Sequence, residues 1–148
     1  MIQFRVVRFE NEEQATKLVT ELMPLAKKHW PKACGKFGDP FKINFELLGT
    51  AWQMKYIMLI TARENGVLIG YALWETAPPF LGTKNWSDSL AFFMEKGFDE
   101  MLDFSAAVLK ENGYQNIRIT SNNRNKGMVK LLSKKGFNVH CETMERLI

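Results

Sequence analysis

Stretches that alternate between apolar and polar residues, or that are largely apolar and β-branched, predict the strands of this protein. Asn65 and Gly66 separate two such stretches and are typical of a tight hairpin. Gly70, inside the second stretch, is suited to a bend in the sheet. Residues 80–83 are a candidate for a further short strand. The main predicted strands lie at residues 2–9, 56–62, 67–74 and 116–120.

Apolar residues at helical spacing predict two helices in the first third of the chain. In the first helix Asn11 is typical of a cap, and an apolar stripe continues to Trp30. Pro24 should kink this helix or divide it in two, and Pro31 should end it. The second helix is predicted over residues 41–52 from a weaker pattern.

Residues 87–112 favour one long helix or two abutting helices. Met94 and Phe98 belong to a helically spaced apolar series, and the Ser-Asp-Ser run at its start is typical of a cap. Gly113 should end the helix. Whether residues 87–97 are helix or strand stays open at this point.

The last third of the chain has the order strand, polar turn, basic amphipathic helix, glycine and strand. Asn122, Asn123 and Asn125 offer side-chain oxygens that cap a helix start. Gly136 suits the left-handed residue after a helix, and Phe137 begins the next extended run. The helix has an apolar face and a basic face, formed by Met128, Leu131 and Leu132 and by Lys126, Lys130, Lys134 and Lys135.

This block resembles the C-terminal signature of the GNAT superfamily of N-acetyltransferases, in which a strand leads to an Asn, a short helix and a Gly-Phe pair. Asn125 falls on the family Asn, and Gly136 with Phe137 falls on the Gly-Phe pair. The resemblance implies an α/β fold with a mixed, mostly antiparallel sheet and helices on both faces. The length predicts a single domain over residues 1–148.

The resemblance also implies an enzyme that moves acetyl from acetyl-CoA to an amine of a protein or small molecule. Asn125 would orient coenzyme A, and Arg124, Lys126 and Lys130 would reach its phosphates. Each has an alternative structural explanation, because an Asn caps helices and basic residues commonly form a solvated helix face.

Acetyl transfer also needs a base, and Glu75 at the end of a predicted strand is the candidate. An exposed strand-end charge is the commoner role of such a residue and is the alternative explanation for Glu75. Asp88 is a second candidate base, although a place in a first helical turn would explain it. Phe92, Phe93 and Met94 would line a pantetheine groove only if their segment were a strand.

Two departures from the family pattern favour a different function. Leu132 takes the place of a frequent family Tyr that protonates the leaving thiolate, and leucine cannot donate a proton. Residues 95–100 contain one glycine, no arginine and several carboxylates, so the usual phosphate-binding loop is expected to be absent or strongly reduced. The alternative function is a GNAT-like binding or structural module without catalysis.

Residues 80–140 also resemble the small GNAT-like proteins of short-tailed phages, of the internal virion protein A class. This narrower resemblance implies a phage protein that contacts host or virion partners, located within the virion. Leu132 agrees with it.

Composition and charge add limits rather than a new function. Apolar residues make up 46% of the chain and charged residues 24%, which is typical of a soluble globular domain. Two cysteines form no disulfide framework and predict a reducing cytoplasm, and no secretory signal or membrane-spanning run is visible. A homo-oligomer is compatible with this composition.

The net charge of +4 suits an anionic cofactor or partner, with nucleic-acid binding by the basic face of residues 118–135 as a minor third option. His29 with Cys34, and His140 with Cys141, match no standard ligand spacing, so no metal is predicted.

Overall fold

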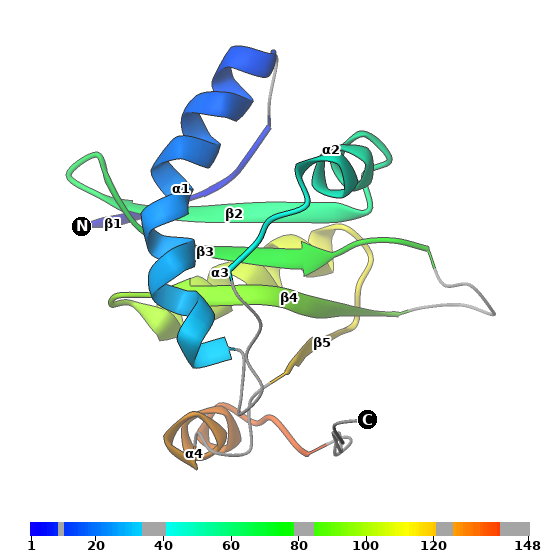
Figure 1. Ribbon diagram of the computed structural model, residues 1–148. Coiled ribbons are helices and arrows are strands. Elements are labelled where there is room, and N and C mark those ends of the chain that lie inside the picture. Colours follow the sequence, from blue (N-terminus) through cyan, green and yellow to red (C-terminus); the bar gives the residue numbers. More distant parts are fainter. Residues whose placement is uncertain (9–10, 34–40, 79–84, 121–125, 140–148) are drawn as a thin grey trace, which may run out of the picture.

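The computed structural model describes residues 1–8, 11–33, 41–78, 85–120 and 126–139 of the 148-residue chain. Within these ranges the chain forms one five-stranded sheet with helices on both faces (Figure 1). The strands are β1 (Ile2–Val6), β2 (Ile57–Glu64), β3 (Val67–Glu75), β4 (Trp86–Met94) and β5 (Asn116–Ile119). The helices are α1 (Glu12–Ala33), α2 (Phe45–Gln53), α3 (Phe98–Glu111) and α4 (Lys126–Lys134).

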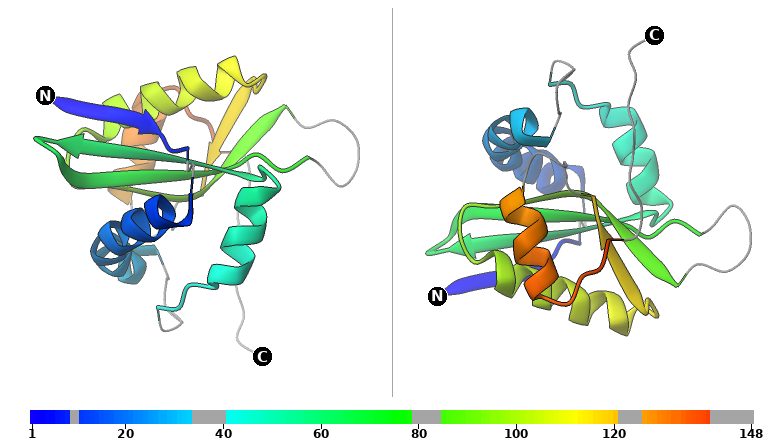
Figure 2. Two further views of the ribbon diagram at one scale, coloured as in Figure 1. Left: turned by 90° about the horizontal axis from the view of Figure 1, so that it is seen from above. Right: turned by 90° about the horizontal axis from the view of Figure 1, so that it is seen from below.

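The strand order is β1-β2-β3-β4-β5, and every neighbouring pair is antiparallel except β4 and β5. A parallel pair needs a crossover connection, and α3 supplies it. Figure 2 shows α1 and α2 on one face of the sheet and α3 on the other. The predicted mixed, mostly antiparallel sheet with helices on both faces is therefore confirmed.

The predicted hairpin between β2 and β3 is confirmed. Asn65 and Gly66 both have positive φ, 50° and 82°, as a two-residue primed turn requires. The β2–β3 register shifts between Ala62 and Arg63, beside Gly70. A Cβ on Gly70 would lie 2.1 Å from the sulfur of Met94, so this position needs glycine for close packing against β4.

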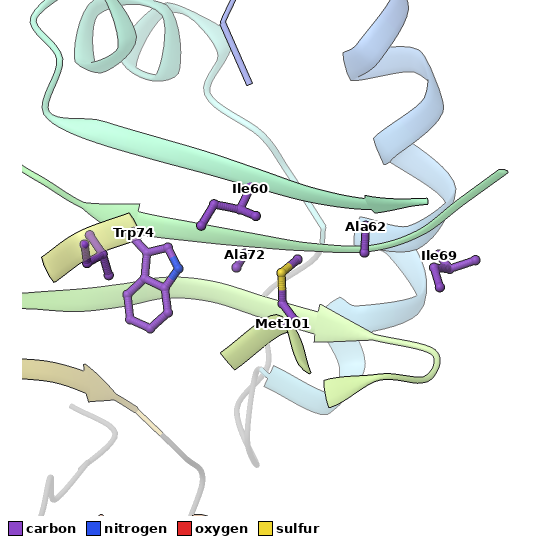
Figure 3. Close-up of a cluster of buried hydrophobic side chains, with 7 residues drawn as sticks. Ile60, Ala62, Ile69, Ala72, Trp74 and Met101 are labelled. Carbon is purple, nitrogen blue, oxygen red and sulfur yellow. The ribbon is translucent and has the colours of Figure 1, made fainter. Parts of the chain in front are cut away.

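The sheet is buried on both faces, which explains why β2 and β3 are almost continuously apolar. One cluster lies between the sheet and α3; Trp74, Ile60 and Met101 are fully buried within it (Figure 3). The second cluster lies between the sheet and α1 and is built from Leu25, Leu59, Tyr71 and Phe93.

Helix α1 differs from its prediction at both prolines. It runs through Pro24 as one 22-residue helix and ends at Ala33 rather than at Pro31. Pro24 is exposed, and so is Thr20, whose carbonyl loses its helical partner and can bind water instead. The helix therefore does not divide at Pro24, which was one of the two outcomes predicted there, and the predicted end at Pro31 is wrong.

The helix favoured over residues 87–112 is also wrong in its first half, which is strand β4. Successive residues of β4 bury opposite faces: Phe92 packs in the cluster under α3, and Phe93 packs in the cluster under α1. A strand buried on both faces shows no alternation in the sequence, so its apolar residues matched a helical period by coincidence. Gly97, with φ of 72°, separates β4 from α3.

The predicted ends of α3 and α4 are confirmed, and both are glycines with positive φ. In α4 the amide of Phe137 donates to the carbonyl of Leu132 at 3.0 Å, and Gly136 has φ of 83°. Gly113 ends α3 with φ of 89°. Residues 137–139 are described but do not pair as a strand, and residues 80–83 lie outside the described residues.

The second predicted helix is present as α2, somewhat shorter than expected. None of the helices in the described ranges has both the length and the apolar character needed to cross a membrane.

Candidate functional site

Strand β4 is paired along very different lengths on its two edges. On one edge it pairs with β3 from Ser89 to Met94. On the other edge its described pairing with β5 covers only Trp86 to Ser89, and Ile119, the partner of Ser89, is the last residue of β5. Figure 1 shows β5 leaving the line of β4 and running toward α4. The second half of β4 therefore has an edge that β5 does not cover.

A bulge in β4 lies where the strands separate. Trp74 pairs with Ser89 and Leu73 pairs with Ala91, so Leu90 is an extra residue with no opposite partner on β3. Leu90 is 54% exposed. Bulges of this kind re-aim side chains and often lie next to active sites, which makes this point of the sheet the candidate functional site.

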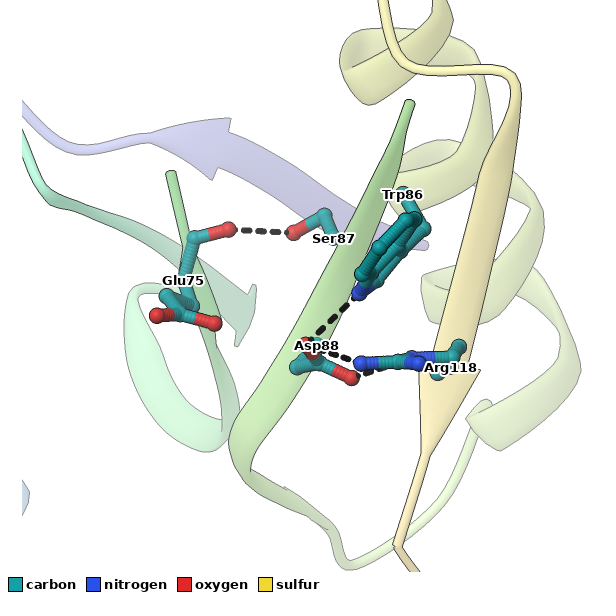
Figure 4. A network of polar contacts seen from close by, with 5 residues as sticks. All are labelled: Glu75, Trp86, Ser87, Asp88 and Arg118. Carbon is teal, nitrogen blue, oxygen red and sulfur yellow. Dashed lines mark hydrogen bonds and ion pairs between the residues drawn. The ribbon is translucent and has the colours of Figure 1, made fainter. Parts of the chain in front are cut away.

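A charged pair joins β4 to β5 one residue before they separate (Figure 4). Asp88 and Arg118 lie opposite each other in the ladder, and the guanidinium donates to both carboxylate oxygens, at 2.6 and 2.8 Å. The indole N–H of Trp86 donates to Asp88 at 3.2 Å, and its ring lies 4.5 Å from the Arg118 guanidinium carbon. Asp88 therefore lies on a strand. The alternative explanation of Asp88 from the sequence, a place in the first turn of a helix, is wrong.

The candidate base Glu75 is the last residue of β3 and is half-buried. The fully buried Ser87 donates its hydroxyl to the Glu75 carbonyl oxygen at 2.7 Å and so fixes the backbone of Glu75 to β4. Trp74 packs in the cluster under α3, so the next residue, Glu75, projects from the face that carries α1 and α2. Arg118 projects from that same face, because its neighbours in β5 pack under α3.

The side chains of Phe92, Phe93 and Met94 belong to the core rather than to a groove. The ring of Phe92 lies 4.8 Å from that of Phe98, and Phe93 is 7% exposed and packs near His29, with ring centroids 5.3 Å apart. At its uncovered edge β4 therefore presents backbone N–H and C=O groups. This predicted groove segment is a strand, as its condition required, and its three side chains pack in the two core clusters.

The turn between β4 and α3 is short and its charged side chains are already paired. Lys28 binds Glu95 at 2.5 Å, and Lys96 binds Glu64 at 2.5 Å and lowers the pKa of that carboxyl. Gly97 caps α3 without a side-chain hydrogen bond.

The first turn of α3 carries two carboxylates, Asp99 and Glu100, beside its backbone N–H groups. Lys135 binds Asp99 at 3.2 Å. Negative side chains already stabilise this helix start, and the reduction of the phosphate-binding loop stays a prediction.

The four residues predicted to bind the cofactor divide into two groups. Lys126 and Lys130 are exposed on α4, and Asn125 and Arg124 lie outside the described residues. Leu132, at the position of the family Tyr, is 7% exposed and packs inward.

The predicted absence of a metal site concerns residues that the structure covers only in part. His29 bonds through Nδ1 to the hydroxyl of Tyr71 at 3.0 Å, and burial raises the pKa of Tyr71 to about 12. Cys34, His140 and Cys141 lie outside the described ranges, and no cluster of three or more metal-ligating side chains occurs inside them.

Sequence reasoning missed Arg118 as an individual residue and placed it only in a general basic face. Its pairing with Asp88 depends on the register between β4 and β5. No local pattern contains that register, because α3 separates the two strands in the chain.

The sequence matches no family model and no curated protein. The structure is similar to those of several acetyltransferases. A ribosomal-protein-alanine N-acetyltransferase from Brucella melitensis biovar Abortus 2308 has a TM-score of 0.70 and 14% identity, over 100% of this chain and 97% of that one. An aminoglycoside acetyltransferase from an uncultured soil metagenomic sample, in complex with sisomicin, has a TM-score of 0.74 and 8% identity, over 99% and 95%.

A predicted acetyltransferase from Clostridium acetobutylicum, solved with acetyl-CoA, has a TM-score of 0.63 and 15% identity, over 99% of this chain and 96% of that one. Identities this low establish the fold and leave the activity to be argued from the site. Together with the sheet order, they show that this chain has the fold of the GNAT superfamily of acetyltransferases.

Proposed function

We propose that this protein is an N-acyltransferase that moves acetyl from acetyl-CoA to an amine of a protein or small molecule. The observation that carries the proposal is the edge of β4 beyond Ser89, which β5 leaves uncovered beside the bulge at Leu90. An uncovered strand edge offers backbone N–H and C=O groups to an extended ligand. The pantetheine arm of coenzyme A carries two amides and can pair with such an edge as a short added strand.

The donor site fits the cofactor unevenly along its length. The edge of β4 suits the pantetheine amides, whereas Asp99 and Glu100 at the start of α3 oppose a diphosphate there. We therefore place the phosphates toward the basic side of α4, with Lys126 and Lys130, and with Asn125 and Arg124 in the roles predicted from the sequence. The bound thioester supplies the activated acyl group.

Glu75 is the proposed base, acting directly or through a water on the proton of the acceptor amine. The amine nitrogen bonds to the acetyl carbon as the C–S bond breaks, and coenzyme A leaves as a thiolate that takes its proton from water, because Leu132 cannot supply one.

Both oxygens of the other candidate, Asp88, already accept hydrogen bonds from Arg118 and Trp86, which occupy this carboxylate. Ser87 holds the backbone of Glu75 at the same point of the sheet.

A second candidate function is a GNAT-like binding or structural module without catalysis, including a phage protein that contacts host or virion partners. Two observations favour it. Leu132 is packed in the core where the family has a proton donor, and the start of α3 is acidic. In this case the location is the virion rather than the cytoplasm, and the partner is a protein.

Isothermal titration with coenzyme A tests the first function. We expect binding in the micromolar to millimolar range, and an affinity at least about threefold lower in the double variant Lys126→Ala, Lys130→Ala, because two cations near the phosphates are lost. Lys110→Ala, an exposed lysine at the end of α3, is the matched control and should bind as the wild type does. Absence of binding at millimolar coenzyme A would leave the non-catalytic module.

An assay of acetyl transfer to a panel of amines, measured by the release of the free thiol of coenzyme A, tests whether Glu75 is the base. Glu75→Gln should reduce kcat by about 10²-fold or more while the affinity for coenzyme A stays the same. Glu111→Gln, at the exposed end of α3, controls for a general loss of charge. Full activity in Glu75→Gln would exclude Glu75 as the base.

A further inference from the structure

We propose that Asp88, Arg118 and Trp86 form a clamp that fixes the point where β4 and β5 separate. In this proposal Asp88 and Arg118 are also positioning residues of the acyl-transfer site, a part that rests on the proposed function. Figure 4 shows the three side chains gathered across the two strands. None of them needs to touch the reacting atoms for this role.

The ladder that the clamp would hold is short. Strand β5 has four residues, and its described register with β4 contains four residue pairs. Parallel pairing is slightly weaker per residue than antiparallel pairing. So short a ladder, ending where β4 bulges, needs side-chain contacts to keep its last pair, Ser89 with Ile119, in register.

The clamp lies one pair inside that end. Asp88 and Arg118 are directly opposed, and a bidentate contact at 2.6 and 2.8 Å fixes both the distance and the relative orientation of the strands. Both side chains are about one-third exposed, 27% and 36%, so water weakens the pair less than it weakens a surface pair.

Trp86 adds a second constraint on the same guanidinium. Its ring covers one face of Arg118, and its N–H donates to the same carboxylate that Arg118 binds. A planar guanidinium can make the bidentate bond and the stacked contact together, which an ammonium group cannot reproduce.

The adjacent bond from Ser87 to the Glu75 carbonyl extends the arrangement to β3. The clamp thus connects the candidate base to the start of the uncovered β4 edge. Loosening it should let β4 and β5 move apart and disturb donor binding, in addition to any loss of stability.

The test compares Arg118→Lys and Asp88→Asn with the control Arg63→Lys. Arg63 also forms a partly buried ion pair, with Glu21, but this pair joins β2 to α1, away from the point where β4 and β5 separate. Amide hydrogen exchange of residues 116–119, thermal unfolding, and titration with coenzyme A are measured for each variant. We expect both clamp variants to speed exchange in residues 116–119 on the order of tenfold and to weaken coenzyme A binding by a similar factor.

The double variant Arg118→Lys, Asp88→Asn should be no worse than either single variant, because both remove the same interaction. Arg63→Lys should lower the melting temperature without changing exchange in residues 116–119 or the affinity. Unchanged exchange in Arg118→Lys, or an equal increase in Arg63→Lys, would overturn the clamp. Faster exchange with unaltered affinity would overturn the positioning role. If the wild type does not bind coenzyme A, the proposed function is rejected, and the hydrogen-exchange rates of residues 116–119 still test whether the clamp holds the two strands together.

Discussion

The two edges of β4 differ in what holds them. Toward β3, the edge is paired antiparallel from Ser89 to Met94, and buried side chains pack on both faces of the pair. Toward β5, a parallel ladder ends at Ser89; Ile117 and Ile119 pack under α3 on one face, and the other face carries the charged pair of Asp88 with Arg118. One strand therefore serves as a core element along the edge that faces β3, called the closed edge below. Along the edge that faces β5, called the open edge, it borders the candidate site.

This difference shows how a small sheet can combine stability with a strand edge that the neighbouring strand does not cover. The closed edge is stabilised by burial, which does not depend on direction and is large. The open edge has apolar burial on one face only, where Ile117 and Ile119 pack under α3, and a few oriented polar contacts on the other, which contribute less energy but define geometry. Substitutions on the closed edge should therefore mainly change the free energy of unfolding, and substitutions at the open edge should mainly change binding.

The largest effect is expected for Trp74→Ala on the closed edge. Trp74 is fully buried and packs against Phe92 with ring centroids 6.1 Å apart, so truncation leaves a large cavity. We expect the free energy of unfolding to fall by about 3–5 kcal/mol, measured by urea denaturation.

Trp74→Phe is the control for this substitution. The indole N–H of Trp74 is buried and has no hydrogen-bond partner in the described part of the chain, so removing it relieves a cost. Trp74→Phe should therefore lose only about 1–2 kcal/mol. Equal losses in the two variants would mean that ring volume does not stabilise this edge.

A smaller effect is expected for Gly70→Ala. The added Cβ would lie 2.1 Å from the Met94 sulfur and 2.7 Å from the Phe93 carbonyl oxygen, so β3 and β4 must shift apart. The expected loss is about 1–3 kcal/mol. Gly49→Ala in α2 meets nothing within 4 Å and should stabilise by about 0.5–1 kcal/mol, since glycine disfavours helix interiors. A stable Gly70→Ala protein would contradict the close packing of this edge.

The turns and the helix ends are the parts of the fold that the sequence revealed best. Asn65 and Gly66 predicted the hairpin because a two-residue turn needs positive φ at both positions. Gly136 and Gly113 likewise marked the helix ends. These features are local, so a short window of sequence contains all the chemistry that determines them.

Strand β4 and its register with β5 were harder to predict, for two physical reasons. Strand β4 is buried on both faces, so Phe92 and Phe93 carry no alternation and resemble a helix. The pair of Asp88 with Arg118 depends on a register between strands 30 residues apart. Glu75 was chosen from its strand-end position and stays a prediction, while Arg124 and Asn125 lie outside the described residues.

The next prediction concerns pH and tests burial beside the closed edge. Tyr71 pairs with Phe93 of β4, and burial raises the pKa of its hydroxyl from 10 to about 12. The unfolded chain loses this proton near pH 10 while the folded protein keeps it until about pH 12. The contribution of Tyr71 to stability is thus complete below pH 10 and is lost as pH rises from 10 to 12.

The measurement is urea denaturation of the wild type and of Tyr71→Phe across this pH range. The wild type should lose more stability than the variant, by less than about 1.4 kcal/mol per pH unit, since residual hydration reduces the effect. Lysines that titrate in the same range affect both proteins equally. Parallel profiles would show that the hydroxyl of Tyr71 is not buried.

The smallest change in stability is expected for Leu90→Ala, at the bulge on the open edge. Leu90 is 54% exposed and has no opposite partner on β3, so truncation should leave no internal cavity. The free energy of unfolding should stay within about 0.5 kcal/mol of the wild type. In contrast, Leu59→Ala truncates a β2 side chain that is only 7% exposed, and it should lower the free energy of unfolding by about 2–5 kcal/mol. If the acyl group is held beside the bulge, the KM for acetyl-CoA should change in Leu90→Ala and not in an exposed control such as Val67→Ala in the hairpin. A loss of stability near that of Leu59→Ala would mean that the open edge is packed like the closed one, and the distinction between the two edges of β4 would no longer hold.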